Sequence, residues 1–357
     1  MVALATPLRL SHPRPKGAVE KLTLQNSDID FQFVLRQGRI ESRRLTNKQA
    51  NETVDLPDVD FALEFDNHAV VDPSDFKAEI AQKGAESIAI IYCGVSEATA
   101  GVQVRVEYFL RRAKCYLRKQ ISVRQAQGGI TRRLMRADLD SWRGVKRDWK
   151  STTSDSMPYG SHPIACESLW AGLEFPAAFN SCSKEGFVLR CRPGGKTLLS
   201  EWLPLHSTVF GIAEPGKVKQ AFFRYLADIR LTAPRLVACY NTWYSLPDIY
   251  SERECLALVR DLVKSFYERQ EVFFDFVTLD MGWSDRHSIW GINQAAFWNG
   301  LGPVSETVKS AGGQLGLSIL AKGQTEVGMA DNVKEELSVA PPMDELVLGQ
   351  GAERNTA

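Results

Sequence analysis

The stretch FVTLDMGWSDRHSIW, residues 276–290, places Asp280, two tryptophans and a sharp turn directly behind an apolar run. The run from Phe273 to Leu279 is rich in β-branched and aromatic residues and is interrupted only by Asp275, which is typical of a strand buried on both faces. Such strands usually belong to parallel sheets, whose ligands bind at the carboxyl ends. Asp280 and Trp283 are therefore expected at a binding site, although a β-turn with an aromatic lid explains the pattern equally well.

The sequence around this stretch alternates strands and helices. A strand is predicted from Leu236 to Tyr240, and the capping box formed by Ser251 and Glu254 begins a helix. A second helix, Pro303 to Ser310, precedes a third strand, 314–320. Strands separated by helices imply parallel pairing through right-handed crossovers. The apolar stripe of the first helix comprises Cys255, Leu258, Val259, Leu262, Val263 and Phe266.

The preceding part of the chain, from about residue 20 to 213, is rich in short strand patterns. Segments such as VDFALEF, ESIAIIYCG and VQVRVEYFL alternate apolar and polar residues or form short apolar runs between turn signals. Many short strands with no helical pattern between them indicate a β-sandwich. The period then changes, and an amphipathic helix is predicted from about 215 to 230, ended by Pro234.

The composition is that of an ordinary soluble protein. The 357 residues are 44% hydrophobic, and 43 Lys and Arg balance 43 Asp and Glu, so no global charge attracts nucleic acid or membrane. The first 17 residues do not resemble a signal peptide, and no stretch resembles a membrane span. Seven cysteines without a C-x-x-C pair suggest a reducing compartment, and we expect a cytoplasmic protein.

One local stretch leaves nucleic-acid binding open as an alternative. Residues 111–150 are rich in Lys and Arg, and Tyr116, Trp142 and Trp149 among them could stack on bases. Much of the stretch alternates as strands with one solvated face do, so we expect no nucleic-acid partner. The five histidines form no metal-ligand pattern, and neither a metal nor a cofactor is expected.

Two predicted strand ends instead combine aromatic and acidic residues. CYNTWYSLPD follows the first strand and contributes Asn241, Trp243 and Tyr244, while LDMGWSD follows the second and contributes Asp280 and Trp283. A sugar site needs an aromatic face for the apolar side of the ring and a carboxylate for its hydroxyl groups. These five residues are the predicted saccharide-binding residues. The alternative is that the tryptophans only pack in the core.

A linked series of motifs follows along the chain from residue 168 to 319. The motifs are SLWAGLEFP, RPGGKTL, VFGIAEPGKVKQAFFRYLADIR, YNTWYSL, LDMGWSD and AGGQLGLSI. Together they resemble the glycoside hydrolase family 36, the α-galactosidase-like group of a retaining clan shared with family 27, and the resemblance runs from about residue 20 to 320. It implies an N-terminal β-supersandwich, a TIM (β/α)8 catalytic barrel and hydrolysis of terminal α-glycosidic bonds.

The sequence departs from the family at one position of its best motif. In α-galactosidases the second barrel strand commonly ends D-D-G-W, and the two acids hold galactose hydroxyls. Asp280 matches the first acid, but Met281 stands at the second. A thioether cannot replace a charged acceptor, so the resemblance does not assign galactose as the sugar.

No catalytic residue is predicted. Retaining glycosidases use two carboxyl groups roughly 5 to 5.5 Å apart, and the resemblance places both on the fourth and sixth barrel strands. The sequence from Leu236 onward is about half of the roughly 250 residues of a full barrel. We therefore expect a truncated barrel, whose open edges a sandwich interface or a homo-oligomer would cover.

The predicted organisation has four parts. A flexible N-terminus, 1–20, precedes a β-sandwich domain with a linking helix, 21–232. The first three β/α units of an incomplete barrel, 233–320, and a poorly ordered tail, 321–357, follow. The predicted function is that of a carbohydrate-active protein resembling α-galactosidases, with a non-catalytic saccharide-binding remnant as the alternative.

Overall fold

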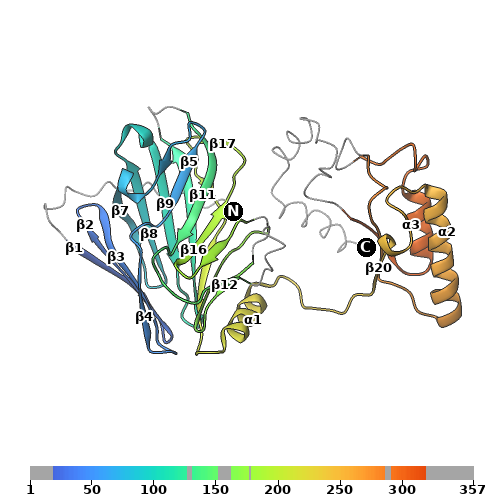
Figure 1. The fold of residues 1–357 in the computed structure, drawn as a ribbon, viewed down its shortest axis with the longest axis horizontal. Coiled ribbons are helices and arrows are strands. Elements are labelled where there is room, and N and C mark those ends of the chain that lie inside the picture. Colours follow the sequence, from blue (N-terminus) through green and yellow to red (C-terminus); the bar gives the residue numbers. More distant parts are fainter. Residues whose placement is uncertain (1–18, 127–130, 152–161, 177, 286–290, 319–357) are drawn as a thin grey trace, which may run out of the picture. The chain divides into compact units, whose positions relative to one another are not determined.

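The computed structural model describes residues 19–126, 131–151, 162–176, 178–285 and 291–318. Backbone contacts divide the chain into two compact units, Met1–Leu231 and Thr232–Ala357 (Figure 1). The predicted tail, 321–357, lies outside the described residues. So does most of the predicted flexible N-terminus, but Val19 and Glu20 already belong to the first strand.

Antiparallel strands make up most of the first unit. Among its described residues they form three sheets, of four, nine and six strands. The four-stranded sheet contains β1 (Val19–Gln25), β2 (Ile29–Arg36), β3 (Arg39–Asn47) and β4 (Glu52–Leu56). The six-stranded sheet contains β5 (Ala62–Phe65), β6 (Val70–Val71), β11 (Arg133–Ser141), β15 (Ser181–Ser183), β16 (Gly186–Cys191) and β17 (Lys196–Thr197).

The largest sheet runs in the order β12-β13-β14-β19-β10-β9-β8-β7, with β18 paired to β10. All its pairs are antiparallel. Its strands are β7 (Phe76–Lys83), β8 (Ser87–Gly94), β9 (Val102–Phe109), β10 (Tyr116–Gln125), β12 (Lys150–Ser151), β13 (Ile164–Ala165), β14 (Leu169–Leu173), β18 (Leu203–Pro204) and β19 (Thr208–Ile212).

One hydrophobic core joins the three sheets. Alternate residues of β9, from Val102 to Tyr108, are buried while those between them are half-buried, as the alternating sequence predicts. These residues pack in the same core as Phe31 of β2 and Leu139 of β11. Figure 1 shows the sheets layered against one another within this unit.

Helix α1 (Val218–Ile229) closes the first unit and lies within the range predicted for it. Its residues Phe222 and Tyr225 pack against Trp170 of β14, with ring centroids 5.1 and 4.8 Å apart. Gly211 of β19 lies opposite Trp170 in the register. A Cβ atom at Gly211 would lie 1.9 Å from the indole ring.

Gly211→Ala is therefore expected to destabilise the first unit by about 1–3 kcal/mol, the usual cost of overpacking. Gly172→Ala, on the neighbouring β14, is the control, because a Cβ atom there would meet nothing within 4 Å. Urea unfolding of both variants checks the expectation. Equal midpoints for the two variants would show that the indole ring moves aside freely.

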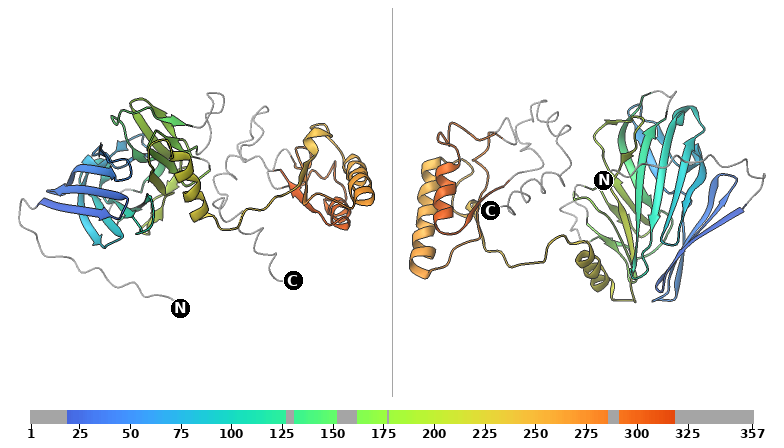
Figure 2. Two further views of the ribbon diagram at one scale, coloured as in Figure 1. Left: turned by 90° about the horizontal axis from the view of Figure 1, so that it is seen from below. Right: turned by 180° about the vertical axis from the view of Figure 1, so that it is seen from behind.

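The second unit has a parallel sheet with the order β20-β21-β22 in its described part. Its elements are β20 (Cys239–Asn241), the short 3₁₀ turn η3 (Thr242–Tyr244), α2 (Glu252–Leu262), the π-helical turn η4 (Val263–Glu268), β21 (Phe276–Leu279), α3 (Gly302–Ser310) and β22 (Gln314–Leu317). The predicted capping box of Ser251 and Glu254 is confirmed. Figure 2 shows α2 and α3 side by side on one face of this sheet.

Two strand predictions in this unit were wrong in detail. The first strand begins at Cys239, and Leu236, where it was expected to begin, is 99% exposed. The second strand is fully buried on one face only, where Val277 and Leu279 pack against the helices, while Phe276 and Thr278 are half-buried. The described residues form no helix that is both long and apolar enough to cross a membrane.

Candidate saccharide site

The carboxyl ends of β20 and β21 bring an amide and a carboxylate together. Asn241 lies opposite Thr278 in the parallel register, so the residues that follow the two strands emerge at the same edge of the sheet. Asn241 Nδ2 donates a hydrogen bond to Asp280 Oδ2 at 2.9 Å. The juxtaposition of these two predicted site residues follows from parallel pairing.

Neighbouring groups hold Asp280 in a fixed position. Its backbone N–H donates to Thr242 Oγ1 at 2.9 Å, and Tyr250 Oη donates to its carbonyl oxygen at 3.0 Å. Its carboxylate also accepts the backbone N–H of Met281 at 2.9 Å. Thr242 and Tyr250 are buried, and burial, the largest cause, raises the pKa of Tyr250. The carboxylate is therefore oriented before any ligand arrives.

A glycine allows the chain to turn sharply after Asp280. Gly282 has φ of +106°, a region that favours glycine. A Cβ atom there would lie 2.8 Å from the Tyr250 ring. The D-x-G sequence thus combines an acceptor with the turn that lets Tyr250 support it.

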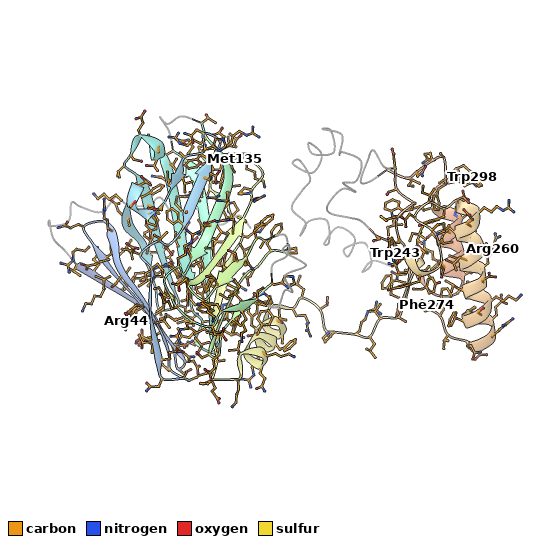
Figure 3. The ribbon with its side chains drawn as sticks, in the orientation of Figure 1. Arg44, Met135, Trp243, Arg260, Phe274 and Trp298 are labelled. Atoms are coloured by element: carbon orange, nitrogen blue, oxygen red, sulfur yellow. The ribbon has the colours of Figure 1, made fainter. Side chains whose placement is uncertain are left out.

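Two aromatic side chains stand exposed beside this pair. Trp243 and Tyr244 belong to the turn η3, which Asn241 caps by accepting the backbone N–H of Trp243 at 2.8 Å. Trp243 is 52% exposed and Tyr244 is 86% exposed. Figure 3 shows Trp243 on the opposite side of the second unit from Arg260 of α2. Both rings offer faces on which a ligand could stack.

The structure places Trp283 differently from the other four predicted site residues. Its side chain is only 3% exposed and packs in the core of the second unit with Phe297 and Val304. Its indole N–H donates to the carbonyl oxygen of Ser318 at 3.1 Å. These contacts are those of a packing residue, which is the alternative that the sequence left open.

Asp275 lies at the opposite end of β21 from Asp280. Asp275 precedes β21 and accepts the backbone N–H of Ala238 at 2.8 Å, whereas Asp280 follows the strand. That hydrogen bond, the largest cause, lowers the pKa of Asp275. No cluster of three or more metal-ligating side chains occurs in the described ranges.

Sequence reasoning missed Thr242 and Tyr250 as supports of Asp280. Thr242 lies inside the motif YNTWYSL and contacts the end of the next strand. Its position directly after Asn241 could have indicated this contact. Tyr250 is 30 residues from Asp280. No local pattern points to that contact.

The basic stretch of the first unit buries two of its three predicted aromatic residues, while Tyr116 is half-buried. Trp142 and Trp149 are buried and contact each other, with ring centroids 5.9 Å apart. The expectation of a solvated basic face was wrong for Lys119 and Arg132, which are 0% and 5% exposed. Both are held by carbonyl oxygens of the interior.

Neither a protein-family model nor a curated protein matches the sequence. Solved structures do match, and among them are three of the α-galactosidase AgaA of glycoside hydrolase family 36 from Geobacillus stearothermophilus. A variant with raffinose has a TM-score of 0.53 at 14% identity. A variant with stachyose has 0.52 at 14%, and one with 1-deoxygalactonojirimycin has 0.51 at 13%. Each match covers 85% of this chain and 56% of AgaA.

Identities this low show the fold alone, and the chain spans just over half the length of the enzyme that it matches. The likeness agrees with the motifs that run from residue 168 to 319 of the sequence. The chain is a mostly β-sheet protein with few helices, and its fold is similar to that of the N-terminal region of the family 36 α-galactosidases, as its motifs predicted.

Proposed function

We propose that this protein is carbohydrate-active and binds a saccharide at the carboxyl ends of β20 and β21. The observation that carries the proposal is the hydrogen bond between Asn241 and Asp280 beside the exposed rings of Trp243 and Tyr244. An oriented carboxylate and amide can bind vicinal hydroxyl groups. An exposed aromatic face covers the apolar side of a sugar ring.

The chain has two proposed functional parts. Residues 21–232 act as a β-supersandwich domain, and residues 233–320 are the first three β/α units of a TIM barrel. The parallel order β20-β21-β22 with α2 and α3 between the strands supports this assignment. The outer strands of that sheet, β20 and β22, have free edges in the described structure, and a homo-oligomer that covers them stays a prediction.

Met281 leaves the identity of the bound sugar open. This residue follows Asp280 directly in the sequence, and it is half-buried. It therefore presents a thioether where the α-galactosidases commonly have a second acid. The printed ligands of the AgaA structures, raffinose and stachyose, are the natural first probes. A sugar with fewer polar contacts at this position is equally compatible with the residues.

Two activities are distinguished by one set of measurements on the purified chain. Hydrolysis of a nitrophenyl α-galactoside would show an enzyme of the α-galactosidase type. Binding of raffinose in calorimetry without turnover would show the alternative, a saccharide-binding protein. The proposal of a carbohydrate site is abandoned if neither turnover nor binding is detected up to millimolar saccharide.

Asp280→Ala is expected to weaken saccharide binding about 10- to 100-fold, because a hydrogen bond to a charged group contributes about 1.5–3 kcal/mol. Asp261→Ala, on the exposed surface of α2, is the matched control and should bind as the wild type does. Calorimetry with raffinose measures both variants. Equal affinity of the two variants would place the site elsewhere.

A further inference from the structure

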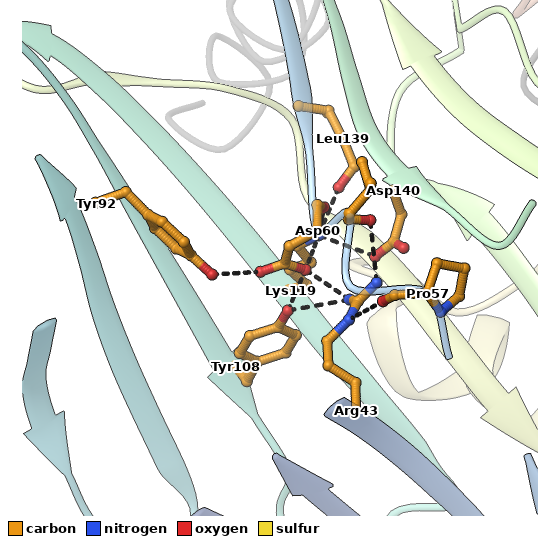
Figure 4. A network of polar contacts seen from close by, with 9 residues as sticks. Arg43, Pro57, Asp60, Tyr92, Tyr108, Lys119, Leu139 and Asp140 are labelled. Atoms are coloured by element: carbon orange, nitrogen blue, oxygen red, sulfur yellow. Dashed lines mark hydrogen bonds and ion pairs between the residues drawn. The ribbon is translucent and has the colours of Figure 1, made fainter. Parts of the chain in front are cut away.

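Four charged side chains meet in the interior of the first unit, away from the proposed site. Arg43 and Asp60 have side chains that are each 1% exposed, and those of Lys119 and Asp140 are 0% exposed. Arg43 lies on β3, Lys119 on β10 and Asp140 on β11, so each comes from a different sheet. Asp60 lies in the connection between β4 and β5. We call these four residues the charge lock (Figure 4).

Asp60 is the centre of the charge lock. Its Oδ1 atom lies 2.6 Å from Arg43 Nη1 and 2.8 Å from Lys119 Nζ, and it also accepts the Tyr108 hydroxyl. Its Oδ2 atom accepts the Tyr92 hydroxyl at 3.3 Å. Burial alone would raise the pKa of Asp60, but Lys119 and Arg43 outweigh it and lower the pKa to about 2.

Asp140 is held much less completely. Its Oδ2 atom accepts from Lys119 Nζ at 3.0 Å, while its buried Oδ1 atom has no hydrogen-bond partner among the residues that the structure describes. Burial is the largest influence on the pKa of Asp140 and raises it. Asp138, on the same strand, pairs with Arg190 instead. The charge lock therefore has two cations and two anions, of which one anion is weakly satisfied.

Buried ion pairs add little net stability compared with apolar packing, but they penalise arrangements that leave one charge without its partner. A set drawn from three sheets can be satisfied only when all three are correctly placed. We propose that the charge lock acts as one charge-balanced unit that fixes the three sheets of the first unit in a single arrangement. The proposal concerns the folding of this unit and is independent of the saccharide site.

The test uses the full chain and measures hydrogen exchange of peptides from β3, β10 and β11 by mass spectrometry. Arg43→Met leaves two carboxylates with one ammonium, and exchange in all three strands should become at least about tenfold faster. Arg44→Met is the matched control. Its side chain is 55% exposed in a pair with Asp55, and exchange should stay as in the wild type.

The deciding variant combines Arg43→Met with Asp140→Asn. It removes one cation and one anion from different sheets and restores the charge balance, so most of the faster exchange should disappear. If Arg43→Met alone yields no folded protein, recovery of folded double variant is the supporting result. The proposal would be overturned if the two substitutions reduced the protection from exchange independently, so that their effects simply added in the double variant. A double variant that also fails to fold would overturn it as well.

A pH series gives a second, independent readout. In Arg43→Met the excess carboxylate should take up a proton in the folded state well above the unfolded value of about 3.9. The groups that act on Asp140 in the wild type are Lys119, Arg43, Asp60 and Tyr108, and Arg43 is absent from the variant. The stability of the folded variant then rises as the pH falls. Its loss of protection from exchange, relative to the wild type at the same pH, should therefore be smaller at pH 5 than at pH 8. A loss of protection that is the same at both pH values would contradict the charge-balance explanation.

Discussion

Replacing Lys119 by methionine is expected to lower the free energy of unfolding of the first unit by about 3–5 kcal/mol, the usual effect of removing one partner from a buried ion pair. Lys119 Nζ donates to the carbonyl oxygens of Asp60 and Leu139 and to Asp140 Oδ2. Methionine fills a similar volume but donates nothing. Asp140 and the carbonyl oxygens of Asp60 and Leu139 then lose a donor in the interior, and the Asp60 carboxylate keeps Arg43, Tyr92 and Tyr108 but loses Lys119.

The control for this prediction is Lys146→Met. Lys146 also faces a carboxylate, Glu185, at 3.2 Å, but the two side chains are 74% and 67% exposed. Exposed pairs of this kind contribute about 0–1 kcal/mol. Urea unfolding of both variants, followed by near-ultraviolet circular dichroism, measures the difference. A loss below about 1 kcal/mol for Lys119→Met would show that the interior rearranges around the missing ammonium group.

Acid should act on the wild type through the same residues. The pKa of Asp60 is lowered to about 2 in the folded protein, below the unfolded value of about 3.9. A lowered carboxylate pKa stabilises the fold above the unfolded pKa, and this contribution is lost as the pH falls toward 2. Unfolding midpoints between pH 5 and pH 2 should therefore fall more steeply in the wild type than in Asp60→Asn.

Substitution by alanine should affect Trp243 and Trp283 differently, although the sequence predicts both as saccharide-binding residues. Trp283→Ala is expected to destabilise the second unit by about 3–5 kcal/mol, because it removes a buried ring and its hydrogen bond to Ser318. Trp243→Ala removes a ring that is 52% exposed. It should change the unfolding free energy by less than about 1 kcal/mol and weaken saccharide binding instead.

Thermal unfolding and calorimetry with a saccharide, carried out on both variants, check this pair of expectations. Trp283→Ala should unfold at lower temperature, and the molecules that remain folded should bind as before. Trp243→Ala should unfold as the wild type does but bind more weakly. The opposite assignment, with a stable Trp283→Ala that no longer binds, would restore Trp283 to the site.

Local sequence signals predicted the parts of this fold that depend on neighbours along the chain. The capping box of Ser251 and Glu254 begins α2 where it was expected, and the alternation of β9 predicts which side chains are buried. The edge where Asn241 meets Asp280 followed from parallel pairing of strands separated by helices. These features need only spacing and turn chemistry.

Features that depend on distant partners could not be predicted in this way. The contacts within the charge lock join residues that are 17 to 59 positions apart. One signal was nevertheless present, because Lys119 lies between Leu117 and Ile121 on the buried face of β10. A lysine in the middle of an apolar face indicates a buried partner, but the sequence does not say which acid provides it. Tyr250, which supports Asp280, gives no such signal.

The most direct test of the saccharide site is hydrogen exchange of the purified chain with and without saturating nitrophenyl α-galactoside. We expect slower exchange in the peptides that span 239–246 and 279–285, where Asn241 and Asp280 meet, and loss of this protection in Asp280→Ala. Protection confined to the first unit, or equal protection in Asp280→Ala, would contradict this expectation.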